Sequence, residues 1–113
     1  MPTDSLCEAN LPPLKVTNPN VTQILLRVQQ TSSIDGLGNY ASIYADVPMG
    51  PVLLSRTQVQ TGQSESLFAV KSGDTFHVRL QLQVSANNTL PEGIWQIQRI
   101  EFIPYCNNQS CSL

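Results

Sequence analysis

The chain has 113 residues, which suits one domain with a single hydrophobic core that needs no metal for its stability. Its net charge of -2 excludes the strong positive field that binds nucleic acid or an anionic membrane, and no apolar run is long enough to cross a bilayer. Only 12% of the residues are charged, against about 25% in an average protein, and eleven glutamines and eight asparagines take their place. We expect this uncharged, hydrogen-bonding surface to contact other protein subunits or a glycan.

The N-terminal residues contain neither a basic region nor an apolar run, so the sequence predicts no signal peptide. We therefore expect synthesis in the cytosol, or secretion if Met1 is not the native start. Residues 1–13 end in Leu11-Pro12-Pro13, and the two prolines favour an extended backbone because they fix φ and donate no amide hydrogen. The sequence predicts an extended N-terminal arm over residues 1–13, either frayed or laid on a neighbouring surface.

Apolar and polar residues alternate in several stretches, which indicates strands that bury one face and expose the other. We expect strands at residues 14–16, 22–30, 40–47, 52–59, 66–71, 75–84 and 94–103. Clusters of glycine, proline and asparagine predict turns at residues 18–20, 48–51, 60–63, 72–74 and 85–93. Seven or eight strands without a helical segment predict an all-β fold, a single antiparallel β-sandwich or jelly roll over residues 14–104.

The clearest alternation lies at residues 75–84, which read T-F-H-V-R-L-Q-L-Q-V. Every second residue from Phe76 to Val84 is apolar, so one face of this strand is buried and the other is in solvent. We expect it to be a central strand of an antiparallel sheet that has one solvated side.

The last predicted strand, residues 94–103, alternates with a change of phase in its middle. Its apolar residues lie first at odd and then at even positions: Trp95, Ile97, Ile100 and Phe102. A β-bulge adds one residue to a strand and would return all four side chains to one face. The sequence therefore predicts a bulge near Gln98 or Arg99.

Two predicted strands carry polar and aromatic side chains on the face that the core does not use. Tyr40 and Tyr44 are four positions apart, about 13 Å along a strand at roughly 3.3 Å per residue. Their rings are either buried or exposed as an aromatic-polar strip that binds a sugar or a partner protein. The candidate interaction face consists of Tyr40, Ser42, Tyr44, His77, Arg79, Gln81 and Gln83.

The three cysteines leave one thiol unpaired however the other two join. Cys106 and Cys111 enclose a short local loop, whereas a bridge from Cys7 to either of them closes a loop of about 100 residues, worth roughly 4 to 5 kcal/mol on the chain-entropy model. The remaining thiol is available to another subunit, and all three stay reduced in a cytosol. Residues 105–113 are expected to form a polar C-terminal tail that lies beyond the core.

The sequence predicts neither catalysis nor a cofactor. His77 is the one histidine, and its place on the solvent face of a strand is typical of a polar surface residue. The carboxylates are scattered over loops, no glycine-rich phosphate loop is present, and the cysteine spacing does not match a zinc site. In the predicted loop at 31–39, Asp35 is the only charged ligand, which is fewer than calcium usually requires. We expect no enzyme and no bound metal.

These features favour a structural assembly protein, a small β-sandwich subunit that docks on a larger lattice such as a virion capsid, tail or fibre. The prediction depends on the absence of an export signal, the charge-poor surface, the polar extensions at both ends and an exposed strand edge that can accept another chain. We expect a virion or extracellular particle as its location. Its partners would be other protein subunits, in a homo-oligomer or a larger assembly, with no nucleic acid and no membrane insertion.

The closing stretch from Gly93 to Pro104, G-I-W-Q-I-Q-R-I-E-F-I-P, resembles the last strand of galactose-binding-type jelly rolls. The resemblance covers these dozen residues and implies a carbohydrate-binding module or lectin as the alternative function. Members of that family often supply an aromatic platform near their loops, for which Trp95, Tyr40 or Tyr44 is the candidate here. The phase of Trp95 in its strand predicts that its ring is buried.

Overall fold

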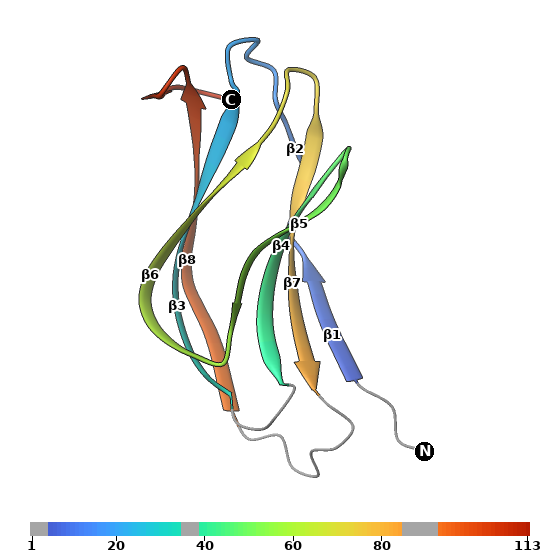
Figure 1. The fold of residues 1–113 in the computed structure, drawn as a ribbon, viewed down its shortest axis with the longest axis vertical. Coiled ribbons are helices and arrows are strands. Elements are labelled where there is room, and N and C mark those ends of the chain that lie inside the picture. The colour runs from blue at the N-terminus through green and yellow to red at the C-terminus, as the bar shows by residue number, and fades with distance from the viewer. Residues whose placement is uncertain (1–4, 35–38, 85–92) are drawn as a thin grey trace.

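The computed structural model describes residues 5–34, 39–84 and 93–113, so the predicted loop residue Asp35 lies outside the described residues (Figure 1). The described ranges form strands connected by turns and contain no helix. The strands are β1 (Ser5–Asn10), β2 (Leu14–Lys15), β3 (Gln23–Ile34), β4 (Tyr40–Val47), β5 (Gly50–Thr57), β6 (Val59–Ala69), β7 (Thr75–Val84), β8 (Gly93–Cys106) and β9 (Gln109–Ser110).

The strands form two antiparallel sheets that pack face to face (Figure 1). The first sheet has the order β1-β7-β4-β5, with the short β2 also paired to β7, and the second has the order β6-β3-β8-β9. The predicted all-β sandwich is therefore confirmed. Its described part has nine strands instead of seven or eight, because the segments expected to be an arm and a tail contribute strands of their own.

Phe76 lies at the centre of the core between the two sheets. It is on β7, which pairs with β1 and β2 on one side and with β4 on the other, as expected for a central strand. The ring of Phe76 meets Phe68 of the other sheet edge-on at 5.3 Å between centroids, and Phe102 at 6.0 Å. Aliphatic side chains from both inner faces surround these rings, chiefly Val16, Ile24, Leu26, Val28, Ile43 and Val78.

The predicted β-bulge in the last strand is confirmed. Gln29 of β3 pairs with Arg99 of β8, but the next residue, Gln30, pairs with Ile97, so Gln98 is the inserted residue. Its insertion restores the phase, and the apolar residues on both sides of it pack against the core: Trp95, Ile97, Ile100 and Phe102. A second register shift, which the sequence did not predict, leaves Leu54 as the extra residue between β5 and β4.

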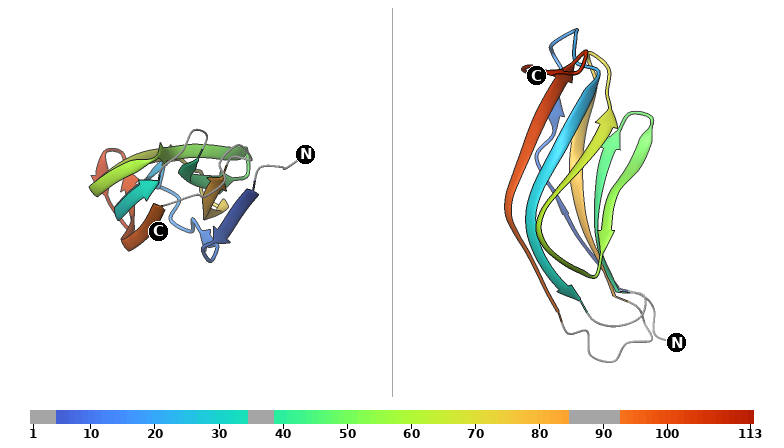
Figure 2. Two further views of the ribbon diagram at one scale, coloured as in Figure 1. Left: turned by 90° about the horizontal axis from the view of Figure 1, so that it is seen from below. Right: turned by 60° about the vertical axis from the view of Figure 1, so that its left-hand side comes forward.

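The predicted turn at residues 60–63 is wrong, because β6 runs without interruption through this stretch. Gly62 sits in the strand opposite Gln30 with a φ of 115°, a backbone conformation that favours glycine. The chain leaves the first sheet at Thr57 and enters the second at Val59, with only Gln58 between them (Figure 2). A glycine inside a polar stretch reads as a turn, but here it permits an irregular point in an edge strand.

Gln58 is held at this crossing by both sheets. Its carbonyl accepts a hydrogen bond from the amide of Ile34 at 2.8 Å, and its side-chain amide donates to the carbonyl of Asn39 at 3.0 Å. Further along, the hydroxyl of Ser66 on β6 donates to the carbonyl of Leu54 on β5 at 3.1 Å. The sandwich is therefore joined along this side.

Part of the predicted N-terminal arm belongs to the sheet, which corrects the boundary placed at residue 14. β1 pairs with β7 over its whole length, from Ser5 opposite Val84 to Asn10 opposite Arg79. The pairing continues into Leu11, whose amide donates to the carbonyl of Val78 at 2.9 Å. The stretch S-L-C-E-A-N has no clear alternation to predict a strand: its residues from Cys7 to Asn10 are exposed, and the strand is held by its pairing with β7.

The predicted C-terminal tail is also folded, which is a second correction. β8 extends to Cys106, and Asn107 and Asn108, with φ of 50° and 69°, form the two-residue turn that leads into β9. The chain then returns to the sandwich, where the amides of Thr17 and Asn18 donate to the carbonyl of Leu113 at 2.9 and 2.6 Å. The side chains of this segment that pack against the core are Cys106, Cys111 and Leu113.

Candidate functional site

The predicted interaction face is brought together on the outer surface of the β1-β7-β4-β5 sheet. Antiparallel pairing of β4 with β7 sets Tyr40 opposite Gln83, Ser42 opposite Gln81, and Tyr44 opposite Arg79. His77 lies opposite Asp46 in the same register. Three charged residues outside the predicted set of seven join this face: Glu8 from β1, Asp46 from β4 and Arg56 from β5. We call these ten residues the polar face.

Arg79 is the centre of the polar face. Its guanidinium donates to both carboxylate oxygens of Asp46, at 3.0 Å from Nε and 3.2 Å from Nη2, and to Oε1 of Glu8 at 3.3 Å from Nη1. The hydrogen bond to Asp46 raises the pKa of Arg79, and Glu8 adds to this effect, while desolvation opposes it. The guanidinium carbon also lies 4.5 Å from the centroid of the Tyr44 ring, close enough for a cation–π contact.

Both carboxylates of this network have a second partner. Nε2 of His77 lies 3.0 Å from Oδ2 of Asp46, and the side-chain amide of Gln81 donates to Oε1 of Glu8 at 2.8 Å. His77 thus contacts a carboxylate that Arg79 already holds. This arrangement orders the surface of three adjacent strands, β1, β7 and β4, without an external ligand.

Arg56 forms a second cluster with the tyrosines. It donates from Nε to the hydroxyl of Ser42 at 3.1 Å and from Nη2 to the hydroxyl of Tyr44 at 2.8 Å, and its guanidinium carbon lies 5.7 Å from the Tyr40 centroid. Both tyrosines are half-buried, so neither of the predicted alternatives describes them fully. Each ring has a guanidinium group over one face, where a stacked sugar would otherwise lie.

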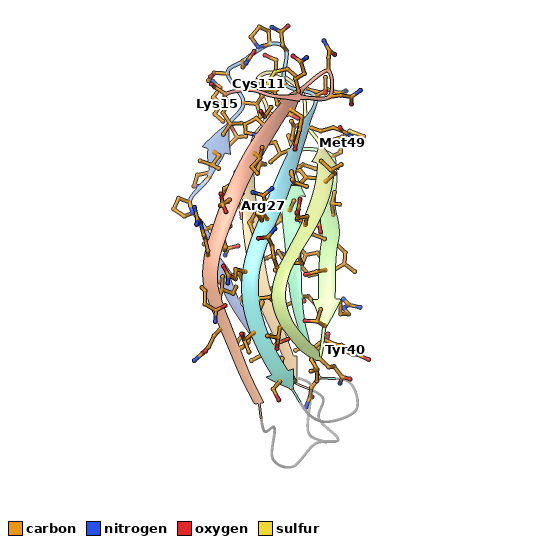
Figure 3. All side chains as sticks on the ribbon, turned by 90° about the vertical axis from the view of Figure 1, so that its left-hand side faces the viewer. Lys15, Arg27, Tyr40, Met49 and Cys111 are labelled. Atoms are coloured by element: carbon orange, nitrogen blue, oxygen red, sulfur yellow. A yellow bond between two sulfur atoms is a disulfide. The ribbon has the colours of Figure 1, made fainter. Side chains whose placement is uncertain are left out.

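An apolar groove opens at the end of the first sheet where the turn between β4 and β5 lies. Its volume is about 410 Å³, and we call it the hairpin groove; it is lined by Val47, Pro48, Met49, Ala69, Val70, Lys71 and Asp74. Met49 at the turn is 91% exposed, and the nearby Leu53 and Val52 are 47% and 38% exposed. Figure 3 shows Met49 at the upper end of the molecule and Tyr40 towards the opposite end.

A second opening lies on the side of the sandwich where β1 and β8 are the edge strands. This side cleft has a volume of about 350 Å³ and is lined by Cys7, Glu8, Ala9, Leu80, Leu82, Trp95 and Ile97. Trp95, predicted to be buried, is only partly so, and its ring nitrogen donates to Oε1 of Gln30 at 2.9 Å. Opposite Leu82 and Leu80, β1 places the small side chains of Cys7 and Ala9, and the two leucines are only partly buried.

The cysteine alternatives are resolved. Cys106 and Cys111 form a disulfide that closes the β8–β9 hairpin, and Cys7 is a free, exposed thiol on β1. Within the described ranges, no group of three or more His, Cys, Asp or Glu side chains is placed to hold a metal ion. The same ranges contain no helix that is long and apolar enough to cross a membrane.

We compared the chain with models of protein families, with curated proteins and with solved structures, and none of them matches.

Proposed function

We propose that this protein is a non-enzymatic assembly subunit that docks on a larger protein lattice, such as a virion capsid, tail or fibre, through its β4–β5 hairpin. The observation that carries the proposal is the exposure of Met49, 91% accessible at the tip of an apolar hairpin beside the hairpin groove. A large exposed apolar side chain beside an apolar groove is typical of protein contact sites.

The size of this surface supports docking of a protein side chain. Full burial of a methionine or leucine side chain is worth about 1.5 to 3 kcal/mol, and Met49 has nearly all of its surface available. The hairpin groove, at about 410 Å³, is large enough for one or two apolar side chains of a partner. Its two charged lining residues, Lys71 and Asp74, carry opposite signs, so the groove selects its partner by apolar contact.

The polar face supports a different role. Its charged groups already bind one another, with Arg79 held by Asp46 and Glu8. Burying such a network under a partner would remove water from charges that have no further need of a ligand. We therefore assign docking to the hairpin and the ordering of the first sheet to the polar face.

The disulfide supports the proposed location in an extracellular particle. Disulfides form and persist in oxidising surroundings and are rare in a reducing cytosol. The bond between Cys106 and Cys111 holds the hairpin that returns the chain to the core. A particle exposed to an oxidising medium would keep this bond intact.

Photo-cross-linking in the native host tests the proposal. The photoreactive residue p-benzoylphenylalanine replaces Met49, and the matched control carries it at Gln63, an exposed position on β6. We expect position 49 to cross-link to one lattice protein in a fast-sedimenting particle, and position 63 to give no such product. Met49→Asp should release the subunit from the particle. Slow sedimentation as a free protein, with no product from position 49, would contradict the proposal.

A carbohydrate-binding function is the second candidate, because Trp95 forms part of the wall of the open side cleft. An indole ring in such a position can stack on a sugar ring. The two tyrosines of the polar face give this candidate less support, since Arg56 and Arg79 lie over their rings. A glycan array distinguishes the candidates: retention of one sugar class, abolished by Trp95→Ala, would favour the lectin.

A further inference from the structure

The outer edge of β1 is unpaired in the part of the chain that the structure describes. β1 is the first strand of its sheet and pairs on one side with β7, while its side chains from Cys7 to Asn10 are exposed. The register with β7 is unbroken over all six residues, so no bulge turns the edge away. Natural sheets usually protect such an edge with a bulge, a proline or a covering loop, and the two prolines here come only after the strand ends.

The hydrogen bonding fixes which backbone groups face outward. The amide of Leu11 donates to Val78, the residue opposite it in the continued register, so these two form a hydrogen-bonded pair. Such pairs alternate with non-bonded ones along antiparallel strands. Ala9 and Cys7 therefore also direct their amides and carbonyls to β7. Those of Leu6, Glu8 and Asn10 point away from β7, and no strand formed by the described residues lies beside them.

We propose that two copies of this chain associate by antiparallel pairing of their β1 strands, which joins the two first sheets into one continuous sheet. The outward amides and carbonyls of one copy meet those of the other, as in strand addition at a sheet edge. This inference uses residues of β1 alone, and neither Met49 nor the hairpin groove takes part in it. It therefore stands or fails separately from the proposed docking function.

Symmetry leaves few registers for this pairing. Outward-facing residues must lie opposite one another, so an even-numbered residue pairs with an even-numbered residue of the second copy. Two registers overlap by five residues of β1. In one of them Glu8 lies opposite Glu8 of the second copy, which sets two like charges together. The other sets Glu8 opposite Leu6 and brings Cys7 opposite Cys7 of the second copy at the twofold axis.

The register that sets Glu8 opposite Leu6 gives the two Cys7 thiols a geometry suitable for a disulfide. Cys7 then occupies a non-hydrogen-bonded pair, in which facing Cα atoms are about 4.5 Å apart. This separation is within the range of about 4.4 to 6.8 Å that a disulfide spans. Cys7 also lines the side cleft, so the side clefts of the two copies would meet at the axis. The free thiol is thus a reporter of the register.

Oxidative cross-linking tests the register. The purified chain, with its Cys106–Cys111 bond intact, is treated with copper phenanthroline, which accepts the two electrons lost when two Cys7 thiols join and release two protons. We expect rapid formation of a covalent dimer. The control is the double variant Cys7→Ser with Ala9→Cys, whose thiols face the same cleft but lie about 13 Å apart along the strands at roughly 3.3 Å per residue, and which should not cross-link.

Backbone variants test the pairing itself by sedimentation equilibrium. Glu8→Pro removes an amide that faces outward, and we expect it to weaken the dimer about tenfold or more, with the pairing to β7 kept. Glu8→Ala removes the same carboxylate but keeps the amide, so it should leave the dimer intact. If Glu8→Pro proves unfolded by circular dichroism, Leu6→Pro replaces it.

Three results would overturn the inference. They are a wild-type chain that sediments as a monomer, a dimer that the folded proline variant leaves unchanged, and equal cross-linking of the Cys7 and Ala9→Cys proteins. Cross-linking between Cys7 of one copy and Ala9→Cys of the other would refute the proposed register, because only the like-charged register places residues 7 and 9 opposite each other.

Discussion

Insertion of one alanine between Ile97 and Gln98 should detach one half of β8 from the core and leave the other half in place. The bulge already absorbs one extra residue, Gln98. Ile100 and Phe102 lie beyond it and are anchored against the core, so a further residue shifts the preceding part of the strand by one position. Since successive side chains alternate between faces, Trp95 and Ile97 would then point into solvent.

The expected loss of stability follows from these two side chains. Full burial of a large apolar side chain is worth about 1.5 to 3 kcal/mol, and Trp95 and Ile97 are half-buried, so each contributes about 1 kcal/mol. The hydrogen bond from Trp95 to Gln30, which is only 1% exposed, adds about 1 kcal/mol. The insertion should therefore lower the free energy of unfolding by about 3 kcal/mol.

Urea unfolding followed by tryptophan fluorescence measures both consequences, because Trp95 is the only tryptophan. A loss of this size moves the midpoint down by about 1 to 3 M urea, and the emission of the folded variant should shift to the red. The matched control, Gln98→Ala, keeps the inserted residue at an exposed position and should change stability by less than about 0.5 kcal/mol. An insertion variant with unchanged midpoint and emission would refute this explanation of the bulge.

Four further predictions concern the core, the polar face, the charge of Arg79 and the disulfide. Phe76→Ala should lower the free energy of unfolding by about 3 to 5 kcal/mol, whereas Thr75→Ala, exposed beside it, should be nearly neutral in the same thermal melts. A double-mutant cycle with Arg79→Met and Asp46→Asn should give a coupling energy of about 1 to 2 kcal/mol. The same cycle on the exposed pair of Arg99 and Glu101 should give less than about 0.5 kcal/mol. Equal coupling energies for the two pairs would contradict the proposed network around Arg79. Because the pKa of Arg79 is raised, its charge should stabilise the fold at every pH below its unfolded pKa, and be lost only as the pH rises through the folded value. Replacing both Cys106 and Cys111 by serine should cost about 2 kcal/mol through the small loop that they close, while Cys7→Ser should leave the melting temperature unchanged.

The sequence predicts the strands whose pattern is set by burial. β7 has one face in the core and one in solvent, so its bounds follow from the alternation alone, and the change of phase in β8 locates Gln98. β1 escapes prediction because its residues from Cys7 to Asn10 are exposed and leave no alternation to read. The uninterrupted β6 escapes for a related reason, since Gly62 in a polar edge strand looks like a turn.

Likewise, only part of the polar face can be predicted from the sequence. Tyr44 and Arg79 were correctly placed on one surface, because each lies on the polar side of a strand with a clear pattern. The partners Glu8 and Arg56 depend on which strands are neighbours and in what register, and strand order is decided by the packing of the whole chain. A single sequence contains no local signal for such pairings. The hairpin groove has the same origin, because it joins the β4–β5 turn to residues near the end of β6.

The crossing at Gln58 makes the two long sides of the sandwich unequal. On that side the single residue Gln58 connects the two sheets covalently and forms hydrogen bonds with Ile34 and Asn39. On the far side the side cleft lies between β1 and β8, and among the described residues no segment of the chain crosses from one strand to the other there. Thermal fluctuations should therefore separate the two sheets first between β1 and β8. The amides of these strands should exchange with deuterium before those next to Gln58.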